Sequence, residues 1–227
     1  MMAPIRNVAV VGAGLVGRGW AIVFAQAGHR VSVHDGSAEI RANVLDRIRQ
    51  SLEDMAAAGL IDAIEPVMER ITVADDLAST VSDADYVQES VFERTDVKRT
   101  ISLEIDAAMR PDAVVGSSSS GIPSSAFTEG CTNRARFLIA HPVNPPHLIP
   151  LVELVPAPWT DAAVVEWLRA EMEAVGQAPI VVRKEVEGFV LNRLQGALLN
   201  EAWALFEDGV ASTADIDLTI SHGLGYR

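Results

Sequence analysis

Apolar and polar positions follow two alternating patterns along most of the chain. Residues 5–14 begin as a short apolar run and end in glycines, which is typical of a buried strand. Residues 15–28 continue with apolar positions at helical spacing and end at a glycine, and residues 30–35 form a second apolar run. This order predicts a strand, a helix and a second strand, the unit from which parallel sheets are built.

The same alternation continues to residue 184. A long amphipathic helix is predicted at residues 37–58. Further helices are predicted at residues 60–71, 93–109 and 160–176, with a short one inside 71–84. Further strands are predicted at the start of 71–84 and at residues 85–90, 112–120, 134–141, 148–156 and 178–184. After residue 184 the strands stop, and residues 188–209 and 212–225 predict two helices, the second with Ser212 or Thr213 as its N-cap.

These patterns predict an α/β domain followed by a helical part. We expect residues 1–185 to form a Rossmann-type, doubly wound domain with a mostly parallel sheet, and residues 186–227 to be all-helical. So few helical residues cannot bury an independent core. They must therefore pack on the first domain, on a partner chain or on further sequence.

Composition and charge exclude several classes of partner. Hydrophobic residues make up 49% of the 227 residues, which is enough for a sizeable core. The net charge of −13 makes nucleic acid and anionic membranes poor partners. The single cysteine, Cys131, allows no internal disulfide, and the histidines show no spacing typical of a metal site. Without a recognisable targeting segment, we expect a cytoplasmic protein that needs no metal.

Gly12, Gly14 and Gly17 form the pattern G-x-G-x-x-G between the first predicted strand and helix. In a dinucleotide-binding turn these glycines permit the tight turn, admit the pyrophosphate and let helix and strand pack closely. The helix N-terminus also favours the phosphate charge. Asp35 ends the second strand, where an acid binds the ribose, and no arginine follows it directly. A glycine-rich turn alone can be structural, but this context predicts a site for NAD rather than NADP.

The segment "IAHPVNPPHLIPLVEL" joins a strand that ends at His141 to a strand that carries Glu153. Its prolines force an extended excursion, and the returning strand can place the carboxylate beside the imidazole. A carboxylate on one ring nitrogen fixes the tautomer and leaves the other nitrogen as a general base. Oxidation of a secondary alcohol needs such a base, because the hydroxyl proton must leave as hydride moves to the nicotinamide. A lone histidine at a strand end can also be structural, and the local sequence leaves both interpretations open.

Other polar residues fall at strand ends or interrupt an apolar helix. Glu89 ends a strand, and the serine run of residues 117–120 directly follows another. The serine hydroxyls can bind a substrate oxygen, or the run can be a flexible loop. Asn192 lies in an apolar helical stretch, where an asparagine is exposed, capping or a buried donor for a ligand.

A family resemblance is carried by four segments: "VAVVGAGLVGRGWAIVFAQAGHRVSVHD", "SSSSGIPSS", "HPVNPPHLIPLVELVP" and "EGFVLNRLQGALLNEAWALFEDGVASTADIDLTISHGLG". In this order they resemble the 3-hydroxyacyl-CoA dehydrogenase superfamily over essentially the whole chain. Within it, "HPVNPP" and "LVELVP" are similar to the lambda-crystallin or L-gulonate 3-dehydrogenase branch. Fatty-acyl enzymes usually have two aromatic residues after the histidine, whereas carnitine 3-dehydrogenase shares the histidine and proline.

The resemblance implies roles for individual residues. His141 is implied as the catalytic base and Glu153 as the carboxylate that orients it. Ser119, or Ser118 after a shift of one residue, is implied to contact the substrate oxygen, and Asn192 to contact the substrate from its helix. The implied cofactor-binding residues, together with the glycine turn, are Gly12, Gly14, Leu15, Val16, Gly17, Asp35, Glu89, Lys98, Ser117 and Asn144.

The resemblance also implies an NAD-dependent oxidoreductase that converts a 3-hydroxy group to a 3-keto group. It implies a homodimer, with residues 186–227 as the start of a longer helical domain for substrate binding and dimerisation. Residues 51–70 hold several acids and only one base, Arg70, whereas a CoA substrate benefits from basic residues. This favours a small substrate such as L-gulonate. The alternatives are a 3-hydroxyacyl-CoA dehydrogenase of fatty acid oxidation, a carnitine 3-dehydrogenase, and a crystallin-like NAD-binding protein without turnover.

Overall fold

The structure is a computed structural model that describes residues 2–226. It divides into two compact units, Met1–Glu187 and Gly188–Arg227. The predicted boundary between residues 185 and 186 lies close to this division. The functions predicted for the two parts stay predictions.

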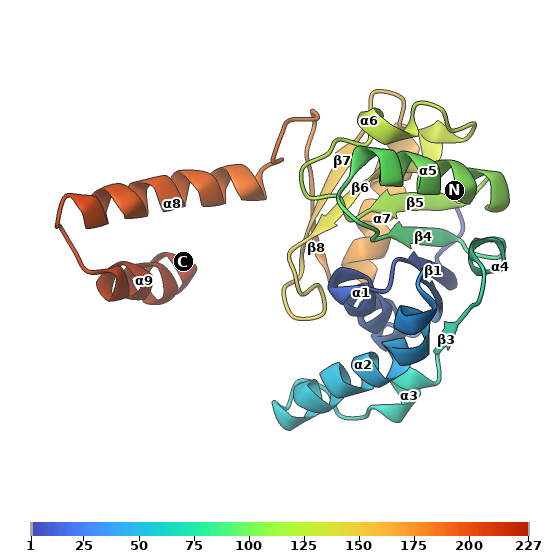
Figure 1. The fold of residues 1–227 in the computed structure, drawn as a ribbon, viewed down its shortest axis with the longest axis horizontal. Coiled ribbons are helices and arrows are strands. Elements are labelled where there is room, and N and C mark those ends of the chain that lie inside the picture. The colour runs from blue at the N-terminus through green and yellow to red at the C-terminus, as the bar shows by residue number, and fades with distance from the viewer. Residues whose placement is uncertain (1, 227) are drawn as a thin grey trace. The chain divides into compact units, whose positions relative to one another are not determined.

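Within the described residues, the first unit is built on one eight-stranded sheet (Figure 1). The strands are β1 (Asn7–Val11), β2 (Arg30–His34), β3 (Ile71–Val73), β4 (Tyr86–Glu89), β5 (Val114–Ser117), β6 (Phe137–Pro142), β7 (Leu151–Pro156) and β8 (Ala178–Val181). Their order is β3-β2-β1-β4-β5-β6-β7-β8, and β1 to β6 run parallel. β7 is antiparallel to β6, and β8 is parallel to β7. The predicted Rossmann-type, mostly parallel sheet is confirmed.

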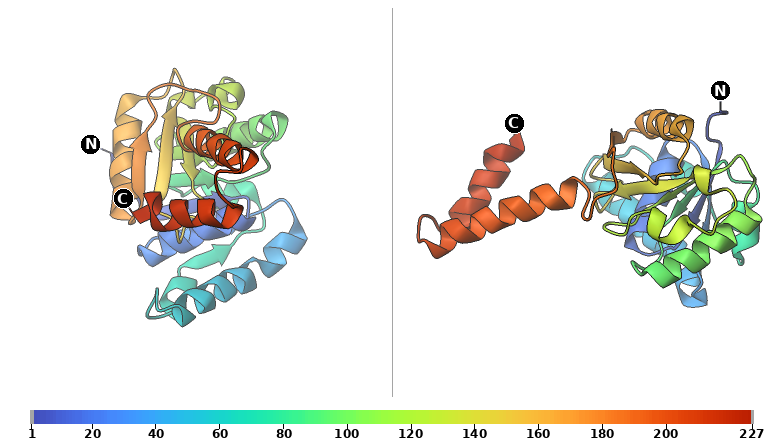
Figure 2. Two further views of the ribbon diagram at one scale, coloured as in Figure 1. Left: turned by 90° about the vertical axis from the view of Figure 1, so that its left-hand side faces the viewer. Right: turned by 90° about the horizontal axis from the view of Figure 1, so that it is seen from above.

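Helices cover both faces of this sheet. They are α1 (Leu15–Gln26), α2 (Ala38–Ala57), α3 (Glu65–Met68), α4 (Leu77–Val81), α5 (Thr95–Ala108), α6 (Ser125–Thr128) and α7 (Ala162–Ala174), with a 3₁₀ turn, η1 (Arg134–Arg136). Side chains alternate along β1, so Val8 and Val10 join the core under α1, α2 and α7, while Ala9 and Val11 join the core under α4 and α5. Figure 2 shows α5 and α7 on opposite faces.

Most helices are a few residues shorter than predicted, and two of the differences have a clear physical reason. Residues 60–71 were expected to be helical, but only Glu65–Met68 is. Pro66 lies in the first turn of this short helix, and its ring prevents the helix from extending back through residues 60–64. The helix predicted at residues 93–109 begins only at Thr95, because Arg94 has extended backbone angles and serves as the N-cap. Glu93 therefore lies outside the helix.

The second unit consists of α8 (Leu191–Glu207), α9 (Thr213–His222) and a 3₁₀ turn, η2 (Leu224–Tyr226). Ser212 is the N-cap of α9, as one of the two predicted alternatives had it, and its Oγ accepts a hydrogen bond from the Asp215 amide at 3.2 Å. None of the helices in the described part of the chain combines the length and apolarity that a membrane span requires.

Gly116 in β5 provides a test of how tightly the sheet and its core are packed. A Cβ at this position would lie 2.0 Å from the Tyr86 hydroxyl and 2.9 Å from the Ala140 Cβ. Tyr86 is fully buried, and its hydroxyl donates a hydrogen bond to Gln88. We expect Gly116→Ala to lower the free energy of unfolding by about 1–3 kcal/mol, because overpacking forces backbone or side chains to shift. Equilibrium urea denaturation measures this change.

Gly196→Ala is the control, because among the described residues no heavy atom beyond the neighbouring backbone of α8 lies within 4 Å of a Cβ built at Gly196. In the middle of α8, alanine should leave the free energy of unfolding unchanged or raise it by up to about 1 kcal/mol. Equal stability of Gly116→Ala and the unaltered protein would show that the strand yields freely around Tyr86.

Candidate active site

The parallel strands end at one edge of the sheet, and most of the predicted site residues lie there. Gly12 follows β1 and Asp35 follows β2, while Glu89 and Ser117 are the last residues of β4 and β5. Glu89 is paired in register with Ser117, and His141 lies near the end of β6. Ligands of open α/β sheets bind at this edge, so the topology brings these residues to one place.

The glycine turn has the geometry that a pyrophosphate requires. Gly12 has a φ of 95°, and a Cβ there would lie 2.5 Å from the Ser90 carbonyl oxygen. A Cβ at Gly17 would lie 1.8 Å from the Gly12 carbonyl oxygen, so the close packing of α1 on β1 requires glycine. At Gly14, by contrast, no described atom lies within 4 Å of a Cβ, and α1 has no side-chain cap there. An anion can therefore approach the amides at the start of α1, and the site fits a dinucleotide.

Asp35 lies at the mouth of this turn. Its Oδ2 accepts a hydrogen bond from the Ala13 amide at 2.8 Å, and its Oδ1 accepts one from the Ser37 amide at 2.9 Å. Leu15 is mostly exposed and Val16 is partly buried at the start of α1. A carboxylate held here accepts hydrogen bonds from ribose hydroxyls and repels a 2′-phosphate, which favours NAD over NADP.

His141 and Glu153 face each other across the antiparallel pair of β6 and β7. The His141 Nδ1 lies 2.7 Å from the Glu153 Oε2, and the side chains are 8% and 0% exposed. Because a carboxylate accepts hydrogen bonds but does not donate them, Nδ1 carries the hydrogen in this contact. The lone pair of the neutral imidazole is then on Nε2, the state that a general base requires. The structure thus brings together the two residues of the predicted pair.

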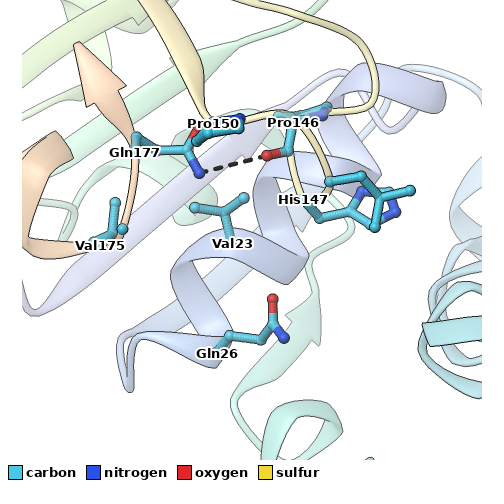
Figure 3. Close-up of a pocket in the computed structure, with 9 residues that line it drawn as sticks. Val23, Gln26, Pro146, His147, Pro150, Val175 and Gln177 are labelled. Carbon is cyan, nitrogen blue, oxygen red and sulfur yellow. Dashed lines mark hydrogen bonds between the residues drawn. The ribbon is translucent and has the colours of Figure 1, made fainter. Parts of the chain in front are cut away.

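The loop of residues 143–150 between these strands packs on α1 through Gly19. A Cβ at Gly19 would lie 2.7 Å from the Pro146 ring and 3.1 Å from the His147 Nδ1. Behind the loop is a pocket of about 290 Å³, lined by Val23, Gln26, Pro146, His147, Leu148, Pro150, Val175, Gly176 and Gln177. Figure 3 shows Gln177 joined to the Pro146 carbonyl beside this pocket. Burial lowers the pKa of His147, which keeps it neutral where it supports the loop.

Ser117 and Ser118 are held inside the edge of the sheet. The Ser117 hydroxyl donates a hydrogen bond to Glu89. The Ser118 Oγ accepts hydrogen bonds from the Trp20 Nε1 at 3.2 Å and the Gln88 Nε2 at 2.8 Å. These contacts join the serine run to α1 and β4, so the start of the run is an ordered part of the site.

Ser119 and Ser120 differ in exposure. Ser119 is 0% exposed, and its Oγ lies 2.7 Å from the Glu93 Oε1 and 2.8 Å from the Ile122 carbonyl oxygen. Ser120 is exposed. The contact of Ser119, or Ser118, with substrate stays a prediction, and the geometry adds Ser120 as an accessible hydroxyl of the same run.

Glu89 and Lys98 form a buried ion pair. The Lys98 Nζ lies 3.0 Å from the Glu89 Oε1 and 3.2 Å from its Oε2, and both side chains are 1% exposed. The Lys98 Nζ also lies 3.3 Å from the Glu93 Oε2. The two predicted cofactor residues thus contact each other beneath the edge of the sheet, and their contact with the nicotinamide stays a prediction.

The two predicted asparagines lie in different units. Asn144 is exposed in the loop that follows β6, and Asn192 lies in the first turn of α8 in the second unit. Their roles stay predictions. Glu93 was not among the predicted site residues, and Ser120 was included only as a member of the serine run. The available signal was that each lies a few residues beyond a strand that ends at the site.

Comparison with known proteins assigns the chain to a family. Residues 7–186 match the NAD binding domain of 3-hydroxyacyl-CoA dehydrogenase, and residues 188–227 match its C-terminal domain. The chain belongs to the 3-hydroxyacyl-CoA dehydrogenase family. The resemblance inferred from the four sequence segments is confirmed, and so are an NAD-dependent enzyme acting on a CH–OH group and NAD as its cofactor.

Several members of the family are similar over nearly the whole chain. Lambda-crystallin from Oryctolagus cuniculus is 42% identical over 225 residues, which are 97% of this chain and 70% of that protein. L-carnitine dehydrogenase from Streptomyces coelicolor is 38% identical over 223 residues, with 98% and 70% covered. The crystal structure of FadB2 from M. tuberculosis has a TM-score of 0.89 and 32% identity, with 98% of this chain and 79% of that chain covered.

The geometry suggests how this dehydrogenase moves a proton. NAD, when bound at the glycine turn, supplies the nicotinamide that accepts the hydride. We expect the His141 Nε2 to take the hydroxyl proton of the substrate. Glu153 then holds the Nδ1 hydrogen and stabilises the imidazolium that forms, because it is buried against the ring at 2.7 Å.

Replacing His141 separates this role from a structural one. We expect His141→Ala to lower kcat by about 10²- to 10⁴-fold, the usual contribution of a general base, and to leave NADH binding nearly unchanged. Steady-state kinetics measure the first effect, and titration of NADH fluorescence measures the second. His147→Ala, in the loop that follows β6 and against Gly19, should keep most of the turnover. Loss of both turnover and NADH binding in His141→Ala would make His141 a structural residue.

Proposed function

We propose that this protein oxidises the C3 hydroxyl of a small polar 3-hydroxy acid and passes the hydride to NAD, with a sugar acid such as L-gulonate as the best candidate. The observation that carries the proposal is the buried pair of His141 and Glu153 at the same sheet edge as the glycine turn. A proton acceptor and a hydride acceptor are what this oxidation requires. The 42% identity to lambda-crystallin supports the branch suggested by "HPVNPP" and "LVELVP".

The charge near the loop of residues 143–150, which we call the proline loop, argues against a CoA thioester. A pocket of about 200 Å³ between the end of α2 and this loop is lined by Ser51, Asp54, Met55, Ala58, Leu60, His147 and Leu148. Asp54 is the charged residue of this lining, because burial lowers the pKa of His147 and keeps its ring neutral. If the phosphates of CoA reached this pocket, they would meet a carboxylate and no cation from the lining, on a protein whose net charge is −13.

Carnitine is the second candidate, because the same acidic surface suits a substrate that carries a cation. The 38% identity to the L-carnitine dehydrogenase of Streptomyces coelicolor supports it. Oxidation of 3-hydroxyacyl-CoA remains the alternative that the family name suggests. A crystallin-like protein that binds NAD without turnover is the alternative outside enzymology, and the intact His141–Glu153 pair argues against it.

A parallel assay of three substrates tests the proposal. L-gulonate, L-carnitine and 3-hydroxybutyryl-CoA are each offered with NAD and with NADP, and the formation of reduced cofactor is followed by its absorbance. We expect kcat/KM for L-gulonate with NAD to exceed that for the CoA thioester by at least about tenfold, or ~1.4 kcal/mol in transition-state binding. His141→Ala is the matched control for every substrate.

The other outcomes each identify an alternative. Turnover of the CoA thioester alone would overturn the proposal and would show that CoA binds despite the acidic lining around Asp54. Turnover of carnitine alone would replace the sugar acid by a cationic substrate. NAD binding without turnover of any of the three would favour the crystallin-like alternative.

A further inference from the structure

A closed ring of charged and hydroxyl groups joins the end of β4, the start of α5 and the serine run. The Lys98 Nζ contacts Glu89 at 3.0 Å, and Glu89 accepts a hydrogen bond from the Ser117 hydroxyl. The Ser117 Oγ accepts one from the Ser119 amide at 3.2 Å. The Ser119 Oγ contacts Glu93 at 2.7 Å, and Glu93 returns to Lys98 at 3.3 Å. Each member of the ring therefore restrains the positions of its neighbours.

Glu93 makes the most contacts with the serine loop, which we define as residues 119–122. Its Oε1 accepts hydrogen bonds from the Ser120 amide at 2.8 Å and the Gly121 amide at 3.1 Å, in addition to the Ser119 hydroxyl. A single carboxylate oxygen thus gathers three donors at 3.1 Å or less from consecutive residues. Since Glu93 follows β4 and the loop follows β5, the contact fixes the loop to the neighbouring strand end.

Stability alone does not account for this ring. Lysine and glutamate are almost never fully buried unless they are paired, and Lys98 and Glu89 are each 1% exposed. Apolar residues of similar volume usually stabilise a fold as well as or better than a buried ion pair. The ring contains two carboxylates and one ammonium group, and it lies directly beneath the sheet edge at which the substrate reacts.

The ionisation of Glu93 suits it to accept these hydrogen bonds. Burial raises the pKa of Glu93, but the charge of Lys98 and the hydrogen bonds from Ser119, Ser120 and Gly121 outweigh burial and lower the pKa overall. A carboxylate whose folded pKa is lowered loses its stabilising contacts only when the pH falls through that pKa. At neutral pH Glu93 is therefore an acceptor for all three donors.

We propose that Glu93, with Lys98 as its buried counter-ion, is a positioning residue that holds the serine loop in the shape the dehydrogenase reaction needs. Glu93 acts through the loop, whose exposed Ser120 and buried Ser119 it holds at fixed positions. Lys98 keeps the second oxygen of Glu93 occupied and so orients the first toward the loop. This inference rests on the proposed function in one respect, because it requires the serine loop to contact the substrate.

Hydrogen–deuterium exchange of peptides covering the serine loop tests the positioning without any substrate. We expect Glu93→Ala to speed exchange of the Ser120 and Gly121 amides by about 10- to 100-fold, the range expected for hydrogen bonds to a charged group. Exchange of β1 and β4 should not change. With whichever substrate the protein turns over, kcat/KM should fall by about 10- to 100-fold, because a reacting group displaced by roughly 1 Å costs that much.

Arg94→Ala is the matched control, because Arg94 is the next residue and its ion pair with Asp96 lies on the surface. It should change neither exchange nor kcat/KM. Unchanged exchange of the serine loop in Glu93→Ala would overturn the proposal. Faster exchange with unchanged kcat/KM would also overturn it, since the ring would then serve the fold alone.

Glu93→Gln retains an acceptor oxygen of the same reach and loses the charge. We expect it to keep part of the loop protection and of kcat/KM that Glu93→Ala loses, and it serves as the test if the alanine variant fails to fold. Losses in Glu93→Gln equal to those in Glu93→Ala would overturn positioning through the acceptor oxygen. Failure of L-gulonate as a substrate leaves the exchange result intact, so the two proposals fail independently.

Discussion

The reversal of strand direction between β6 and β7 is the constraint on which the active site depends. Opposite residues of an antiparallel pair place their side chains on the same face with Cβ atoms about 5 Å apart, which is within reach of a hydrogen bond between long side chains. His141 and Glu153 occupy such opposite positions. A slip of one residue would turn Glu153 to the other face of the sheet. In the described sheet, the parallel strands therefore place the glycine turn, and the antiparallel pairing of β6 and β7 places His141 beside Glu153.

Two buried carboxylates fix how the elements at this edge of the sheet are aligned. Glu153 and Glu89 are almost completely buried, and a buried charge is tolerated only when it is paired and hydrogen-bonded. Glu153 has His141, and Glu89 has Lys98 and the Ser117 hydroxyl. These partners come from different strands and from α5, so each pair fixes one element against another. The same ion pairs and hydrogen bonds thus also align the strand ends.

The sequence predicted the parts of the structure that depend on local patterns. Apolar runs separated by glycines and periodic helices gave the strand and helix order, and G-x-G-x-x-G with Asp35 gave the cofactor turn. The helix predicted at residues 60–71 was mostly wrong. The prediction followed the spacing of apolar residues, which carries no information on Pro66, and proline is tolerated only in the first turn of a helix. Glu93 was missed because the start of α5 is set by the backbone angles of Arg94.

Contacts between distant residues were beyond prediction from local patterns. Nothing in the spacing of Ser119 and Glu93 shows that they meet, because the contact depends on how β4 and β5 pair. For the same reason the run of four identical serines gave no sign of which hydroxyl is buried and which is exposed. His141 and Glu153 were predictable because one loop connects their strands, and such a loop favours antiparallel neighbours.

A protein with a net charge of −13 that binds an anionic cofactor benefits from recognising phosphate by groups other than charged side chains. We expect the glycine turn to do this with backbone amides and the dipole of α1, which are independent of the net charge of −13. A CoA substrate brings further phosphates that extend away from the strand ends, where recognition depends on lysine and arginine side chains. The described pocket between α2 and the proline loop offers Asp54 instead. A small acid with a single carboxylate needs only one cation, which is why we propose it as the substrate ahead of CoA.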